Sequence, residues 1–90
     1  MSFSFKIERP KDLIYVLSKL KSEAGQHNIS FKGDEKRGSA SGYGFVGEYT
    51  VYTDNIELTV HKKPFIVTEA KIKQTVKEFM AKIESESNLR

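Results

Sequence analysis

The segment spanning residues 43–62 constrains the fold most, because apolar and polar residues alternate in it on both sides of an Asp-Asn pair. Asp54 and Asn55 are residue types that tolerate the positive φ of a two-residue turn, so we predict a β-hairpin that turns at these positions. In that register Val51 pairs with Leu58. The apolar side chains of both strands then share one face, which comprises Tyr49, Val51, Ile56, Leu58 and Val60.

The other face of this hairpin is polar, as is typical of an antiparallel sheet that is covered on one side only. The predicted register places Glu48 opposite His61, and we interpret the two as a cross-strand ion pair rather than an acid–base pair. Gly42, Gly44 and Gly47 surround the start of the hairpin. Glycines inside a strand indicate a bulge, a strong bend or the close approach of another element.

Two helices are predicted from apolar residues at helical spacing. The first covers residues 10–24, with Asp12 in its first turn and Gly25 as a left-handed stop. The second begins after Thr68, a favourable N-cap residue. Its apolar stripe comprises Ile72, Val76, Phe79, Met80 and Ile83. The polar tail at residues 84–90 is expected to fray.

Shorter alternating runs predict the remaining strands, at residues 3–8 and 29–32, and Gly33 with Asp34 predicts a turn after the second of these. Residues 35–42 are polar and rich in glycine, which is compatible with a strand or a mobile loop. We favour a strand at 36–41.

The resulting order is β-α-β-(β)-β-β-α within one domain that covers residues 1–90. Each predicted strand has one apolar face and each helix has one apolar stripe. The simplest way to bury all of these surfaces is an α+β fold, in which one antiparallel sheet of four or five strands carries both helices on one face.

Composition narrows the cellular location of the protein and the classes of molecule that it is expected to bind. The chain has no cysteine, which excludes disulfides and thiolate chemistry and fits a reducing cytoplasm. It shows neither the apolar run of a signal peptide nor a segment long enough to cross a membrane. The net charge of +3 is well short of the concentrated basic face of a dedicated nucleic-acid-binding protein.

No catalytic or metal-binding motif stands out in the sequence. His27 and His61 are isolated from each other and from further ligands, so we predict no metal site. Gly42, Gly44 and Gly47 have the spacing of a dinucleotide fingerprint, but they enter a strand instead of opening a helix, so we predict no nucleotide cofactor. We therefore predict that the protein is not an enzyme.

Short motifs spread along nearly the whole chain resemble those of the small polyhydroxyalkanoic acid system proteins, a bacterial family encoded near genes for storage-polyester granules. The motifs are Ile7-Glu8-Arg9-Pro10 with Leu13, Gly33-Asp34, Val46 with Gly47, Ile56, Leu58 and Val60, and Pro64-Phe65 before Ile72. The sequence departs from the family at Lys11, where relatives carry histidine, and in the polar segment 35–42. The resemblance implies a cytoplasmic, granule-associated protein without established catalytic residues.

The preferred hypothesis is a non-enzymatic domain that binds a protein partner or a granule surface; the outer sheet face also permits a homodimer. A second hypothesis is a carrier of small apolar ligands, with a pocket between the sheet and the last helix formed by Tyr49, Val51, Leu58, Val60, Phe79 and Met80. A third is weak RNA binding. The basic residues available for an anionic partner are Lys36, Arg37, Lys62 and Lys63, joined for nucleic acid by Lys71 and Lys73.

Overall fold

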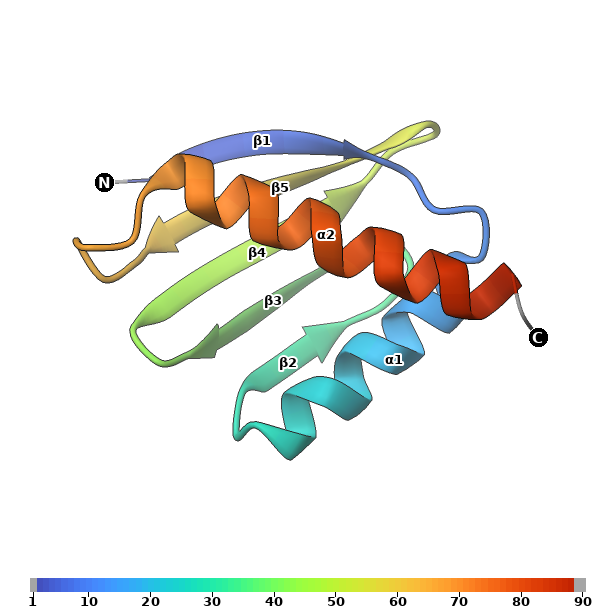
Figure 1. The fold of residues 1–90 in the computed structure, drawn as a ribbon, viewed down its shortest axis with the longest axis horizontal. Helices are drawn as coiled ribbons and strands as arrows, with labels where there is room; N and C mark the ends of the chain where they lie inside the picture. The colour runs from blue at the N-terminus through green and yellow to red at the C-terminus, as the bar shows by residue number, and fades with distance from the viewer. Residues whose placement is uncertain (1, 89–90) are drawn as a thin grey trace.

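The computed structural model describes residues 2–88 and has the predicted α+β architecture (Figure 1). Its elements, in chain order, are β1 (Phe3–Glu8), α1 (Leu13–Gln26), β2 (Ser30–Gly33), β3 (Arg37–Gly42), β4 (Phe45–Val51), β5 (Asn55–Lys62) and α2 (Glu69–Asn88). The five strands form one antiparallel sheet in the order β1-β5-β4-β3-β2. The segment left open between strand and loop is therefore a strand, β3, which begins at Arg37.

Both helices pack on the same face of the sheet. Ile7 of β1 and Ile56 of β5 are paired across the sheet, and they form a buried cluster with Leu13 and Leu17 of α1. Val76 and Met80 of α2 pack against the same cluster. The opposite face of the sheet is polar, as predicted: Ser4 and Thr59 share a hydrogen bond of 2.8 Å there.

The hairpin turns one residue earlier than predicted. The amide of Tyr52 donates to the carbonyl of Asn55 at 2.8 Å, so Thr53 and Asp54 form the turn, and Val51 pairs with Ile56. The predicted register was thus wrong by two residues, which leaves every side chain on its predicted face because strand side chains repeat every two residues. β1 pairs with β5 as far as Asn55, and its neighbour Arg9 donates its amide to the Asp54 carbonyl, so these contacts stabilise a turn at Thr53 and Asp54.

The stretch around Tyr43 also differs from the prediction, because it is a turn and not part of a strand. Tyr43 (φ 54°) and Gly44 (φ 84°) link β3 to β4, and Gly42 pairs with Phe45. Positive φ at both central residues is the geometry that suits a two-residue hairpin. The Tyr43 hydroxyl donates to the His27 carbonyl, which holds the tyrosine in this conformation. Gly47 does mark a β-bulge, since the register of β4 on β5 shifts there.

The helix ends differ from the predictions in three places. Asp12 is the N-cap of α1 and not a residue of its first turn; its carboxylate accepts from the amide of Tyr15 at 3.2 Å. Gly25 continues α1, and Asn28 (φ 58°) provides the left-handed residue instead. The tail predicted to fray is helical to Asn88, while residues 89–90 lie outside the described part of the chain. Thr68 caps α2 as predicted, accepting from the Lys71 amide at 3.1 Å.

The two ends of the sheet differ in how well they are covered. We call the end that carries the Thr53–Asp54 turn the closed end, because Ile7, Leu13 and Ile56 are buried there. At the other end, here called the open end, the Tyr43–Gly44 turn meets the loop between β5 and α2. Figure 1 shows α2 and α1 diverging from the closed end towards the open end.

Candidate functional site: an apolar groove

A cavity of about 570 Å³ lies between the sheet and the two helices. The helices leave it open because α2 begins beside β1 whereas α1 runs beside β2, at the opposite edge of the sheet, and the two helices approach each other only at the closed end (Figure 1). The central strands β3 and β4 therefore lie under the gap between the helices, and both contribute to the lining. We call this cavity the groove.

The floor of the groove is low because β3 carries only small residues on this face. Its inward positions are Gly38, Ala40 and Gly42, and the Cα partner of Ala40 on β4 is a further glycine, Gly47. Gly38 is covered by the ring of Tyr49, and Gly42 is covered by the side chain of Ile29. Ala40 and Gly47 both line the groove, and Phe31 on β2 is the large residue paired with Ala40, so the floor is low at the Ala40–Gly47 pair.

The walls and roof are apolar. Aromatic and aliphatic side chains from β2, β4 and β5 face others from both helices, and nearly all of them are only half-buried. They include Leu20, Ile29, Phe31, Phe45, Tyr49, Leu58, Val60, Ile72, Val76, Phe79 and Met80. This degree of exposure is unusual for the layer between a sheet and its helices, where such side chains ordinarily fill the space.

Five of the six residues that sequence reasoning assigned to a pocket line the groove: Tyr49, Leu58, Val60, Phe79 and Met80. Val51 does not; it pairs with Ile56 at the closed end and packs against the buried cluster. The prediction missed the contributions of α1, of Phe31 and of the floor at Ala40. The signal for the floor was present as small residues at alternate positions of the segment that became β3.

The hydroxyl group of Tyr49 is engaged in a hydrogen bond and does not face the interior of the groove. It donates to the Asp34 carbonyl at 2.7 Å, which leaves the aromatic ring as the surface over Gly38. Burial raises the pKa of Tyr49, and the charges of Asp34 and Glu35 raise it further. Asp34 closes the β2–β3 turn by accepting from the amides of Lys36 (2.8 Å) and Arg37 (3.2 Å), and these bonds lower its pKa.

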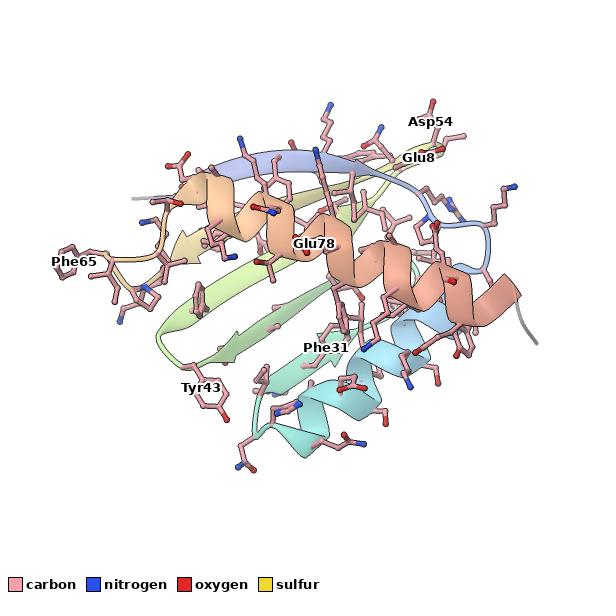
Figure 2. The ribbon with its side chains drawn as sticks, viewed as in Figure 1. Glu8, Phe31, Tyr43, Asp54, Phe65 and Glu78 are labelled. Carbon is pink, nitrogen blue, oxygen red and sulfur yellow. The ribbon has the colours of Figure 1, made fainter. Side chains whose placement is uncertain are left out.

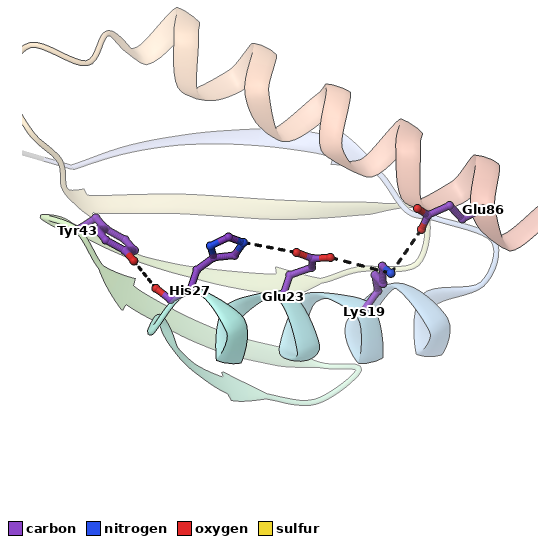
Figure 3. A network of polar contacts seen from close by, with 5 residues as sticks. All are labelled: Lys19, Glu23, His27, Tyr43 and Glu86. Carbon is purple, nitrogen blue, oxygen red and sulfur yellow. Dashed lines mark hydrogen bonds and ion pairs between the residues drawn. The ribbon is translucent and has the colours of Figure 1, made fainter.

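Polar side chains border the groove along α1. Lys19 lies 3.9 Å from Glu86 of α2 and 4.0 Å from Glu23, which in turn lies 3.7 Å from His27. Figure 3 shows these side chains on the flank of α1 that faces α2, with Tyr43 joining the series at the His27 carbonyl. Ion pairs this long and this exposed contribute little to stability, and none of these four charged residues belongs to the lining itself.

The basic residues predicted as an anion or partner contact do not form one patch. Lys36 and Arg37 lie at the closed end, where the Lys36 carbonyl accepts from the amide of Val51. Lys62 and Lys63 lie at the open end, and the Lys63 ammonium donates to the Val67 carbonyl at 2.8 Å. Of the two further lysines proposed for nucleic acid, Lys71 and Lys73, only Lys71 lines the groove.

The histidines are separated, as the sequence suggested. His61 lies 3.1 Å from Glu48 on the outer sheet face, although the two are diagonal neighbours, since Glu48 pairs with Thr59. Within residues 2–88, no three histidine or carboxylate side chains gather in a way that suits a metal ion. The same part of the chain contains no helix with both the length and the apolar character needed to cross a membrane.

Comparisons with known proteins return no relative for this chain. No family model matches it, and no curated protein or solved structure matches it either. Membership of the polyhydroxyalkanoic acid system family and a cytoplasmic location therefore stay predictions from the sequence.

Proposed function

We propose that the protein binds a small molecule with a long apolar part, such as a fatty acid, in the groove. The observation that carries the proposal is the cavity itself: about 570 Å³ lies within the range of ligand pockets, and its lining is formed almost wholly by apolar side chains. Water forms few hydrogen bonds with such a lining. A bound hydrocarbon chain, in contrast, removes both its own apolar surface and that of the lining from water.

The exposed surface of the protein supports the same proposal. A compact monomer of 10.3 kDa exposes about 5,400 Å². This chain exposes 6399 Å². Many of the half-buried side chains line the groove, so a molecule seated there covers part of this excess.

The lining also indicates the shape of the ligand. Lys71 and Thr75 are exposed on α2 at the border of the groove, while Val76, Phe79 and Met80 continue the same helix towards the closed end. The carboxylate of a bound fatty acid then lies beside Lys71 and near water, and the hydrocarbon chain of the ligand runs inward along the groove. Burial of about ten methylene groups contributes at most about 8 kcal/mol, which corresponds to a micromolar dissociation constant.

The arrangement favours ligand binding over the other two hypotheses. A nucleic acid needs a continuous basic surface, and Lys36 and Arg37 lie at the opposite end of the sheet from Lys62 and Lys63. A flat granule surface or protein partner does not account for a concave cavity.

Titration with dansyl-labelled undecanoic acid tests the proposal. We expect saturable fluorescence enhancement with one site per chain and a dissociation constant of about 1 µM, because the labelled chain leaves water on binding. Unlabelled fatty acids should displace the probe, and longer chains should displace it at lower concentrations. A signal that rises linearly without saturation, or that fatty acids do not reverse, contradicts the proposal.

A further inference from the structure

The loop between β5 and α2 presents two large apolar side chains to solvent. Phe65 is 92% exposed and Ile66 is 78% exposed. Figure 2 shows Phe65 projecting from the open end of the molecule, away from all helices and strands. Large apolar side chains that are fully exposed and adjacent to each other mark a surface that another molecule covers.

This loop is held in a defined shape. The amide of Val67 donates to the Pro64 carbonyl at 3.1 Å, which closes a turn with Phe65 and Ile66 at its two central positions. The Lys63 ammonium donates to the Val67 carbonyl at 2.8 Å and braces the same turn. Because the turn is already formed, little conformational entropy is lost when the two side chains are covered.

Further apolar side chains lie beside the loop. Pro64 contacts the β3–β4 turn, since a Cβ on Gly44 would stand 3.3 Å from its Cγ. Tyr43 of that turn is 68% exposed, and Val46 is also exposed. Figure 2 shows Tyr43 at the same end of the molecule as Phe65, opposite to Asp54. We call Tyr43, Val46, Phe65 and Ile66 together the apolar tip.

The segment that carries Phe65 and Ile66 is positively charged. Residues 61–73 contain four lysines and one glutamate, so this segment carries a net charge of +3 with histidine neutral. The whole chain also carries +3, so the remainder of the molecule is neutral on balance. Apolar side chains with lysines in the same segment complement a surface that is anionic outside and hydrocarbon inside.

We propose that the apolar tip docks on an anionic phospholipid bilayer, with Phe65 and Ile66 inserted among the acyl chains and Lys62 and Lys71 at the phosphate level. A second copy of this chain is a poorer occupant, because two tips in contact bring together two segments of charge +3. The proposal stands on residues other than the groove floor, so it does not require that the groove binds a ligand.

The position of the tip connects it to the groove. Tyr43 and Val46 belong to the tip and also line the groove, as do Val67 and Lys71 from the adjoining loop and helix. Docking therefore places the open end of the groove against the bilayer. If the groove binds fatty acids, as proposed above, the ligand passes between bilayer and groove without crossing water.

A tryptophan reporter tests the docking directly, because the chain contains no tryptophan. We expect the emission of a Phe65→Trp variant to shift to shorter wavelength with vesicles of equal parts phosphatidylcholine and phosphatidylserine, and brominated lipids to quench it. The matched control is Ile14→Trp, at a residue that is 65% exposed in the first turn of α1. Its emission should not change. Equal shifts in both variants, or none in either at low salt, overturn the proposal.

Further variants separate the contributions of the apolar side chains and of the lysines to vesicle binding. The double substitution Phe65→Ser with Ile66→Ser should weaken vesicle binding at least tenfold. Lys62→Gln should weaken it about fivefold and reduce its salt dependence. A Phe65→Trp shift that appears with rising protein concentration alone indicates self-association and overturns the proposal. The double variant should still bind dansyl-labelled undecanoic acid in solution, so failure of docking and failure of the groove are distinguished.

Discussion

Ile83→Asp is expected to lower the thermal unfolding midpoint of the protein by more than about 10 °C. Ile83 is 1% exposed, on the part of α2 that converges with α1, three residues before Glu86 reaches Lys19. A carboxylate placed there is buried without a partner that compensates its charge, and such substitutions lower the free energy of unfolding by about 3–5 kcal/mol. A domain of this size is stable by about 5–10 kcal/mol, so a large fraction of its stability, about half, is lost. Circular dichroism during thermal unfolding measures the effect.

The matched control is Ala81→Asp on the same helix. Ala81 is exposed and lies two residues away, so the helix receives the same charge, and a larger loss of helix propensity, without burial of the carboxylate. We expect its midpoint to fall by a few degrees at most. If the two variants melt at similar temperatures, α2 does not pack on α1 as described, and the groove loses its roof.

Ala40→Phe is expected to abolish ligand binding while leaving the fold intact. The aromatic ring rises from the lowest part of the floor into space that is otherwise available to the ligand. Titration with dansyl-labelled undecanoic acid should give an affinity at least tenfold weaker. The ring also buries new apolar surface, so the free energy of unfolding should rise by about 1 kcal/mol.

Ser39→Phe provides the control for this substitution. Ser39 is the preceding residue of β3, and its side chain lies on the outer sheet face, where its Cα partners are Lys32 and Glu48. The same change in volume and strand propensity there should leave the affinity unaltered. Equal losses of affinity in both variants contradict a binding site in the groove, and a strongly destabilised Ala40→Phe variant shows that the space is already filled.

Periodicity in the sequence was sufficient to assign the faces of the elements. Alternation in residues 49–60 placed Tyr49 and Leu58 on the covered face, and the apolar stripe of α2 placed Phe79 and Met80 opposite them. These two patterns are local, because each depends only on the repeat of one strand or one helix. For that reason five of the six predicted pocket residues lie together in the structure.

Features that depend on distant segments were not predictable in the same way. The hairpin turn is in contact with β1, which pairs with β5 as far as Asn55 although about fifty residues separate the two strands in sequence. Tyr43, which has a positive φ, donates its hydroxyl to the carbonyl of His27, at the end of α1. The helical conformation of residues 84–88 accompanies packing of α2 on α1, which a polar composition does not reveal.

The groove itself results from small side chains on β3, and no single sequence motif predicts it. Gly38, Ala40 and Gly42 appeared in the sequence as a polar, glycine-rich segment of uncertain type. Only the strand order, which places β3 under the gap between two diverging helices, turns these small residues into a floor. The exposure of Phe65 and Ile66 has a similar origin, because it follows from a turn that projects beyond the sheet.

The most direct test of the account is nuclear magnetic resonance of protein labelled with ¹³C at its alanine methyl groups, mixed with unlabelled hexadecanoic acid. The chain contains four alanines: Ala24, Ala40, Ala70 and Ala81. Because Ala40 lies on the groove floor and both Ala70 and Ala81 are exposed on α2, we expect nuclear Overhauser effects from the fatty-acid methylene protons to the Ala40 methyl group and none to the other two. Contacts with Ala70 or Ala81 in the absence of any with Ala40 would contradict an apolar-ligand site between the sheet and its helices.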